Sequence, residues 1–306
     1  MVNRLKENIR TYFAGKEEVV DNLLICLLAG GHVLIEDVPG VGKTTLAKSL
    51  AGSVGCDFGR IQFTPDTLPG DVLGTRIYNP KTGEFEVKTG AVMHQIVLAD
   101  EINRTSPKTQ SALLEAMGEG QVTVGDTKFM LPRPFMVIAT QNPVEFAGTY
   151  SLPEAQIDRF MMKLSIGYPD KDEEIRIASN ELTGKTVDTV EKVISSEELI
   201  KIQEEVKKIT VKDGVLEYIR DIVDLTRHDN RFVLGASPRA TISLIRASQA
   251  RAYLDGRDFV KPDDVKAVAY PVLNHRLSLT SEARIGREDT EKILKSIILK
   301  VKVPVM

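Results

Sequence analysis

Apolar residues recur at two spacings in the first half of the chain, and the spacings separate helices from strands. Leu5 and Ile9 lie on one helical face, and a denser apolar stripe over residues 20–28 ends at Gly30-Gly31. A glycine-rich turn after the first strand leads into a helical stretch at residues 44–51. Strand, glycine loop and helix in this order predict an α/β unit. Short apolar runs typical of strands occur at residues 33–36, 60–63, 92–100, 122–124 and 135–140.

Two segments in this half are predicted to fold as hairpins. One covers residues 75–88 and turns through Asn79–Gly83, and the other covers residues 121–131 and turns at Gly125-Asp126. Neither hairpin is needed to complete an α/β sheet, so we interpret both as insertions. Between the strands at 92–100 and 135–140, Ser106-Pro107 predicts the start of a helix that ends near Gly118 and Gly120.

The pattern changes after residues 167–170, and the rest of the chain is predicted to be almost wholly helical. Ser195–Glu198 forms a capping box before a helix, and Asp213 is expected to cap the next one. Strands are not expected before the last residues. Further helices are expected at residues 238–254 and 262–269.

Length and composition are those of a globular protein. The 306 residues suffice for two ordinary domains, which we place at residues 1–170 (α/β) and 171–306 (a helical linker and an all-α domain). Hydrophobic residues make up 42% and charged residues 27%. The sequence contains neither a long apolar run nor the apolar core of a secretion signal, so we expect a cytoplasmic protein without a membrane span. The net charge of −3 does not suggest nucleic acid as a partner.

Cysteine and histidine are rare and do not form a recognisable site. Cys26 and Cys56 are expected to be reduced thiols rather than a disulfide. The four histidines lack metal-ligand spacing among themselves or with the cysteines, which argues against zinc. No Ser/His/Asp arrangement for nucleophilic catalysis is apparent.

The glycine-rich turn after the first strand carries the strongest chemical signal. Backbone N–H groups converge at such a turn, and the dipole of the following helix favours phosphate oxygens. Lys43 is expected to reach the β- and γ-phosphates of ATP, and the Thr44 hydroxyl to ligate Mg²⁺. Asp37 occupies the position where the usual phosphate-loop pattern begins with glycine. The candidate nucleotide-binding residues are Asp37, Val38, Pro39, Gly40, Val41, Gly42, Lys43, Thr44 and Thr45.

An apolar strand that ends in two adjacent carboxylates carries the second signal. Asp100 and Glu101 follow the run that begins at Ile96, at the carboxyl edge of a predicted parallel sheet, where α/β folds bind ligands. We expect Asp100 to be a magnesium ligand and Glu101 to activate the attacking water. The alternative is a solvated turn after a core strand.

Together these two motifs resemble the AAA+ ATPases and, in detail, their MoxR family. In that family aspartate is usual at the position of Asp37. Residues 100–117 resemble the family's extended signature, and further matches occur at Ala139–Pro143, Leu152–Phe160 and Gly235–Arg239. The resemblance implies an α/β AAA+ P-loop domain with a central parallel sheet and hairpin inserts, followed by a smaller all-α lid domain.

The resemblance also implies roles for three distant residues. Asn142 matches the first sensor, which helps to position water against the γ-phosphate, although an ordinary Asn-Pro turn is the alternative. Arg159 matches the arginine finger, which acts on ATP bound by the neighbouring subunit; a surface salt bridge is its alternative. Arg239 matches the second sensor of the lid, but Ser237-Pro238 before it also reads as a plain helix start.

By the same resemblance, the protein is expected to hydrolyse ATP to ADP with Mg²⁺ in a hexameric ring of identical subunits. The ring would remodel or mature client proteins, including metal insertion, often with a von Willebrand factor A domain partner. The hairpins at 75–88 and 121–131 match inserts that often face a central pore. Tyr78 and Phe85 are then either client contacts or cross-strand packing residues.

Two other functions stay open at this point. One is a DNA-dependent motor, which the absence of a basic stripe interleaved with aromatic residues disfavours. The other is a nucleotide-gated binding module in which turnover is incidental. The complete set favours hydrolysis: Lys43, Asp100, Glu101, Asn142 and Arg159.

Overall fold

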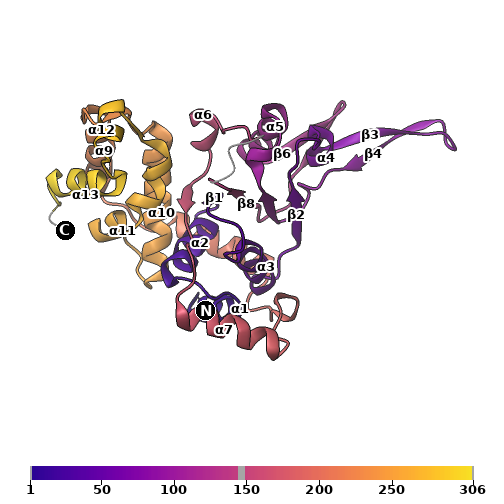
Figure 1. Ribbon diagram of the computed structural model, residues 1–306, viewed down its shortest axis with the longest axis horizontal. Coiled ribbons are helices and arrows are strands. Elements are labelled where there is room, and N and C mark those ends of the chain that lie inside the picture. The colour runs from indigo at the N-terminus through magenta and orange to yellow at the C-terminus, as the bar shows by residue number, and fades with distance from the viewer. Residues whose placement is uncertain (1, 144–148, 305–306) are drawn as a thin grey trace. The chain divides into compact units, whose positions relative to one another are not determined.

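The computed structural model describes residues 2–143 and 149–304, which form two compact units (Figure 1). We call them the α/β unit and the helical unit. The predicted domain limit between residues 170 and 171 stays a prediction. The α/β unit comprises Met1–Asp21, His32–Arg159 and Leu164–Ile200, and the helical unit comprises Asn22–Gly31, Phe160–Lys163 and Lys201–Met306.

A sheet of five short strands positions the candidate site. Its order is β2 (Phe58–Gln62), β5 (Ile96–Asp100), β8 (Met136–Gln141), β1 (Val33–Glu36) and β9 (Met162–Leu164). The pairings β2–β5, β5–β8 and β8–β1 are parallel, so the carboxyl ends of these strands meet at one edge. The strands β1, β5 and β8 are almost wholly buried, as their continuous apolar runs predict. The sequence analysis missed β9, because three residues are too few to show a strand pattern.

Helices α5 (Pro107–Glu119) and α7 (Lys171–Leu182) of the α/β unit begin at polar N-cap residues. Ser106 accepts a hydrogen bond from the Thr109 amide and caps α5, as predicted. Asp170 and Glu173 form a capping box at the start of α7. The helices are α1 (Val2–Tyr12), α3 (Lys43–Ser53), α4 (Pro69–Leu73), α5 (Pro107–Glu119), α6 (Glu154–Ile157) and α7 (Lys171–Leu182), with short 3₁₀ turns η1 (Ile102–Arg104) and η2 (Val187–Thr189), while α2 (Glu17–Leu28) runs across the limit at Asp21.

Both predicted hairpins are present. The first is β3 (Gly74–Asn79) with β4 (Glu84–Thr89), and the second is β6 (Gln121–Val124) with β7 (Thr127–Met130). In the first hairpin, Tyr78 pairs with Phe85 and their ring centroids lie 5.4 Å apart in an edge-to-face arrangement. The two rings therefore pack on each other across the strands, yet 53% and 59% of their surfaces stay exposed.

The helical unit contains most of the helices expected after residue 195, and two short strands that were not expected. Its elements are α8 (Ser196–Lys207, which begins before the limit at Ile200), α9 (Asp213–His228), β10 (Phe232–Leu234), α10 (Pro238–Leu254), α11 (Pro262–Leu273), η3 (Asn274–Arg276), β11 (Ser278–Leu279), α12 (Ser281–Ile285) and α13 (Thr290–Lys300). The prediction of strand only at the chain end was wrong, because β10 and β11 pair with each other across 43 intervening residues or more. Lys212, not Asp213, is the N-cap residue of α9.

The remaining expectations concern membranes and cysteines. Among residues 2–143 and 149–304, none of the helices has the length and apolar character needed to cross a membrane. Cys26 and Cys56 are free, and burial raises the pKa of both thiols. The thiols are therefore held protonated, which fits the expectation that they are reduced.

Candidate functional site

The loop between β1 and α3, residues 37–45, is called the glycine loop. Gly40 and Gly42 have φ values of 84° and 86°, in the left-handed region where a side chain would be strained. Gly42 is the N-cap residue of α3, and its carbonyl accepts the first helical bond from Leu46. The amides of the first helical turn are left without partners inside the helix, so the helix N-terminus presents donors to an anion.

The Asp37 side chain braces the glycine loop from within the protein. One carboxylate oxygen accepts hydrogen bonds from the amides of Ile166 (2.6 Å) and Gly167 (2.7 Å) and from the Ser165 hydroxyl (3.0 Å). The other oxygen accepts from the Val38 amide at 2.9 Å. Asp37 is buried, so aspartate at this position is explained by its contacts to the protein rather than by contact with a ligand.

Lys43 crosses the glycine loop and donates to the Asp37 carbonyl at 2.6 Å. Burial lowers the pKa of Lys43, and the nearby carboxylates Asp37, Asp100 and Glu101 act in the opposite direction. The cation is thus held at the loop by main-chain and electrostatic contacts, where it can meet a phosphate.

Asp100 ends β5 and is fixed by residues from the strands on both sides. Its Oδ1 accepts from the Thr140 hydroxyl of β8 at 2.7 Å, and its Oδ2 accepts from Arg60 of β2 at 2.6 Å. Its side chain is 15% exposed, so one edge of the carboxylate remains accessible.

Glu101 has a left-handed backbone with φ of 57°, which is uncommon outside glycine. Its amide donates to Thr140 Oγ1 at 2.8 Å, which helps to hold this conformation. The Oε2 atom accepts from Gln62 of β2 and from Arg104, each at 3.0 Å. The turn away from extended backbone lets both carboxylates, Asp100 and Glu101, face one cleft.

A cleft of about 360 Å³ gathers most of the predicted site residues. Its volume is of the size that ligand pockets show. The lining residues are Pro39, Gly40, Gly42, Lys43, Thr44, Thr45, Arg60, Asp100, Glu101 and Asn142. Donors suited to phosphate and carboxylates therefore line one cleft, although they lie at or beyond the ends of three different strands, β1, β5 and β8.

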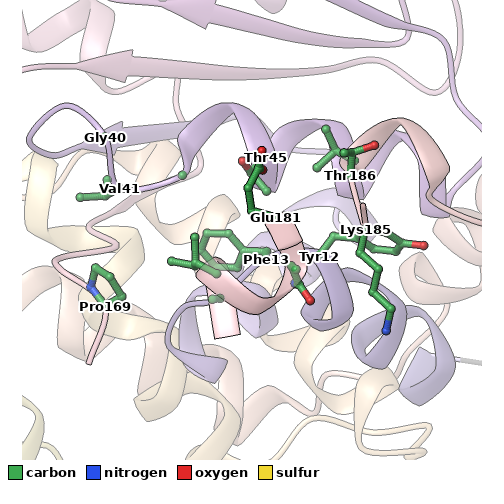
Figure 2. A pocket seen from close by; sticks show the side chains of 14 residues that line it. Tyr12, Phe13, Gly40, Val41, Thr45, Pro169, Glu181, Lys185 and Thr186 are labelled. Atoms are coloured by element: carbon green, nitrogen blue, oxygen red, sulfur yellow. The ribbon is translucent and has the colours of Figure 1, made fainter. Parts of the chain in front are cut away.

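A second pocket, of about 320 Å³, adjoins the cleft and shares Gly40, Gly42 and Thr45 with it. In Figure 2, Gly40 and Val41 lie at one end and Lys185 and Thr186 at the other, with Phe13 between them. Sequence reasoning missed this pocket, because its walls come from three separate stretches. Its apolar lining is Phe13, Ala14, Val41, Pro169, Ile177 and Val187, and its polar lining includes Tyr12, Asn180, Glu181 and Lys185.

The two predicted arginines line neither cavity. Arg159 follows the short helix α6, and its guanidinium donates to the carbonyl of Leu114 in α5. Arg239 lies in the first turn of α10, exposed, in the helical unit. Within the α/β unit the structure therefore brings together Lys43, Thr44, Asp100, Glu101 and Asn142, and it leaves Arg159 outside this group.

Arg60, Gln62 and Thr140 are site residues that sequence reasoning missed. In the sheet, Gln62 stands directly opposite Asp100, and β8 places Thr140 beside the same strand end. Gln62 and Thr140 lie at or next to strand ends, which is a weak signal, and Arg60 lies in the middle of β2. The signal becomes informative only once the strand order is known.

Comparisons with known proteins agree with this geometry. Residues 32–162 match the family described as "ATPase family associated with various cellular activities (AAA)", and residues 224–297 match the "AAA lid domain". A crystal structure of a Cytophaga hutchinsonii protein superposes with a TM-score of 0.93 at 42% identity, covering 99% of this chain and 95% of the other. The fold class predicted from the sequence is thereby confirmed, with β10–β11 as an addition.

Two relatives cover nearly the whole chain. YeaC of Bacillus subtilis (strain 168) is 51% identical over 305 residues, covering 100% of this chain and 95% of the relative. The protein named Chaperone MoxR1 of Mycobacterium tuberculosis is 40% identical over 305 residues, covering 97% and 80%. These matches lie on a chain whose cleft combines a glycine loop with paired carboxylates. The chain belongs to the MoxR family of AAA+ ATPases.

Proposed function

We propose that the ATPase binds MgATP in the cleft of the glycine loop and uses the hydrolysis cycle, within a hexameric ring, to remodel client proteins. The observation that supports this most directly is the shared lining of one cleft by Lys43, Thr44, Asp100 and Glu101. Phosphoryl transfer needs positioning and charge stabilisation more than covalent chemistry, and these residue types supply both.

In this proposal the glycine loop holds the phosphates. The amides at the start of α3 and the Lys43 ammonium meet the β- and γ-phosphate oxygens. Asp37 keeps the loop in shape through the Ile166 and Gly167 amides. Lys43 exchanges its bond to the Asp37 carbonyl for a stronger charge-assisted bond to phosphate.

The residues present fit a magnesium ion. Mg²⁺ prefers oxygen ligands, and the Thr44 hydroxyl and the Asp100 carboxylate are oxygen donors that line the same cleft. When bound, the ion neutralises charge on the phosphate oxygens. Thr140 and Arg60 orient the Asp100 carboxylate through its two oxygens.

Glu101 is the proposed base for the attacking water, and Asn142 helps to orient that water. Both side chains line the cleft, and the left-handed backbone of Glu101 turns its carboxylate toward it. Gln62 and Arg104 fix the carboxylate through Oε2.

The second pocket is proposed to hold the nucleoside. It adjoins the glycine loop, and the Phe13 ring, Val41 and Pro169 provide the flat apolar contacts that a purine needs. Asn180 and Glu181 supply polar groups at its edge.

The position of Arg159 supports a ring in this proposal. Arg159 does not line the cleft of its own subunit, so we propose that it stabilises the transferring phosphoryl group in the cleft of a neighbour. Such head-to-tail contacts close into a ring, for which we propose six subunits. Arg239 is proposed to act on the nucleotide from the lid.

The client-directed role is supported by the relative named as a chaperone, MoxR1. We propose a chaperone-like remodelling or maturation activity, which includes metal insertion and a von Willebrand factor A domain partner, in the cytoplasm. The exposed Tyr78 and Phe85 of the β3–β4 hairpin are candidate client contacts.

The test is the Glu101→Gln variant. Loss of the base should lower phosphate release by about 10²- to 10⁴-fold. Titration with a fluorescent ATP analogue should show unchanged affinity, because the loop is intact. Glu115→Gln, an exposed glutamate on α5, is the matched control and should keep full turnover. Undiminished phosphate release by Glu101→Gln would refute the assignment of Glu101.

A further inference from the structure

Three consecutive polar residues at the end of α11 bind main-chain carbonyls of a distant segment. Asn274, His275 and Arg276 form η3, and we call them the carbonyl clamp. Arg276 is buried, whereas the other two are partly exposed. All three contact residues 160–163, which lie more than 110 positions earlier in the chain.

The clamp's contacts cover almost every residue of that segment. The Phe160 carbonyl accepts from Arg276 at 2.7 Å and lies 3.0 Å from His275 Nε2. The Met161 carbonyl accepts from Arg276 at 3.2 Å, and the Lys163 carbonyl accepts from the Asn274 amide at 3.1 Å. Arg276 also donates to the Val272 carbonyl of α11 and to the Ser243 hydroxyl of α10, so its guanidinium is bonded to both helices.

The charge state of the clamp is well defined. Burial lowers the pKa of His275 well below its usual value, and the charge of Arg276 adds to this effect. The imidazole is therefore neutral, and the positive charge of the cluster resides on the guanidinium. The planar guanidinium of Arg276 carries several N–H donors and can bind neighbouring carbonyls at the same time. The ammonium group of a lysine cannot reproduce this geometry.

The clamped segment directly follows Arg159. Although the residues before and after it, His32–Arg159 and Leu164–Ile200, belong to the α/β unit, Phe160–Lys163 group with the helical unit. The Arg159 guanidinium is anchored within the α/β unit, on the Leu114 carbonyl of α5. The residue after Arg159 is thus held by one unit and its side chain by the other.

We propose that the carbonyl clamp positions Arg159, so that the state of the helical unit in one subunit controls the arginine supplied to the neighbour's ATP. The inference rests on the proposed role of Arg159 as a finger. The Cα atoms of residues 159 and 160 are about 3.8 Å apart, so a shift of the clamped carbonyls moves the base of the Arg159 side chain. Asn274, His275 and Arg276 are positioning residues, because they act through the carbonyls of residues 160–163.

The first experiment is a double-mutant cycle between Arg276→Lys and Arg159→Ala in the full-length protein. A displacement of about 1 Å at a catalytic group lowers the rate by about 10²-fold, so Arg276→Lys should lower kcat by about 10- to 100-fold. KM for ATP should change by less than about twofold, because the subunit's own glycine loop is intact. In the Arg159→Ala background, Arg276→Lys should lower kcat no further.

Arg257→Lys is the matched control. Arg257 is another largely buried arginine of the helical unit, with bonds to Asp264 and to the Phe259 carbonyl. Its replacement should lower the melting temperature, and its effect on kcat should be the same in both backgrounds. If Arg276→Lys unfolds the protein, Asn274→Ala replaces it in the cycle with a smaller expected loss of kcat. This substitution removes the bond to Lys163 and the contact between Asn274 Oδ1 and His275 Nδ1.

The second experiment mixes subunits. Arg276→Lys subunits have an intact cleft, whereas Glu101→Gln subunits have an intact clamp and finger. In mixed rings, Glu101→Gln subunits should supply Arg159 to the clefts of neighbouring Arg276→Lys subunits. Turnover per Arg276→Lys subunit should therefore rise. Mixing Glu101→Gln subunits with Arg257→Lys subunits should not raise turnover per Arg257→Lys subunit, because that substitution does not act through Arg159.

The outcomes separate the two proposals. If Arg159→Ala itself keeps full kcat, the finger role fails and the clamp's role falls with it. If Arg159→Ala lowers kcat but Arg276→Lys does not, the clamp inference alone is overturned. The same holds if the loss from Arg276→Lys is equal in both backgrounds, or if mixing gives no rescue.

Discussion

The cleft edge of the α/β unit and the carbonyl clamp of the helical unit use their polar side chains in opposite ways. At the sheet edge of the α/β unit, polar groups bind one another across neighbouring strands: Asp100 with Thr140 and Arg60, and Glu101 with Gln62. In the helical unit, the carbonyl clamp binds main-chain oxygens. Side chains paired at a cleft can exchange partners when a ligand arrives, whereas side chains bound to backbone hold a segment in place.

Asp37 shows that the choice between side-chain and backbone partners depends on what a residue does, and not on the unit to which it belongs. It belongs to the α/β unit, but its carboxylate binds the amides of Ile166 and Gly167. The segment from 160 to 167 is therefore held at one end by a cation on its carbonyls and at the other by an anion on its amides. A backbone strip held at both ends is suited to carry a displacement along its length.

The comparison predicts the largest effect for a cleft residue. Lys43→Met should weaken ATP binding by about 100-fold, because a charge-assisted bond to phosphate contributes about 1.5–3 kcal/mol. Arg239→Met, an exposed arginine of the helical unit, should weaken it much less. Titration with a fluorescent ATP analogue measures both. Equal losses would show that the helical unit binds nucleotide as directly as the glycine loop.

The backbone brace should act on stability. Asp37→Ala leaves the buried amides of Ile166 and Gly167 without their acceptor, which costs about 1–3 kcal/mol of unfolding free energy. Asp37→Asn keeps one oxygen and should be milder. Urea unfolding measures the change, with the exposed hairpin residue Asp126→Ala as the control. A loss of ATP affinity without a loss of stability would mean that Asp37 contacts the ligand.

The comparison also predicts a loss of stability in mild acid. Burial lowers the pKa of His32 from 6.5 to about 4, and its ring accepts from the Val137 amide at 3.0 Å. Because the folded-state pKa lies below the unfolded value, the unfolded chain binds more protons in between. Stability is full above about pH 6.5 and falls toward pH 4, by about tenfold in the unfolding equilibrium per pH unit.

His32→Gln should flatten this dependence between pH 7 and pH 5, measured by urea unfolding. The exposed His228→Gln is its control and should keep the wild-type slope. His275 in the helical unit has its pKa lowered in the same way, so His275→Gln should flatten the curve as well. If only one of the two variants does so, the units differ in acid sensitivity.

The sequence by itself determined the local elements and the chemical identity of the cleft. Caps such as Ser106 and Asp170, and the glycines at 40 and 42, act on neighbours a few residues away, so their effect is readable in order along the chain. Lys43-Thr44 and Asp100-Glu101 are neighbours in the sequence, so each could be recognised as a pair of site residues without the structure.

Only the tertiary structure decided which distant groups complete the site. Arg60 meets Asp100 and Thr140 meets Asp100 across 40 positions each, and Asp37 meets Ile166 across 129. The carbonyl clamp reaches across more than 110. These contacts depend on strand order and on the packing of α10 and α11. A short strand such as β9 has too few residues to show a strand pattern in the sequence. Hydrogen bonds act over about 3 Å in space and are indifferent to separation along the chain, so no local pattern encodes them.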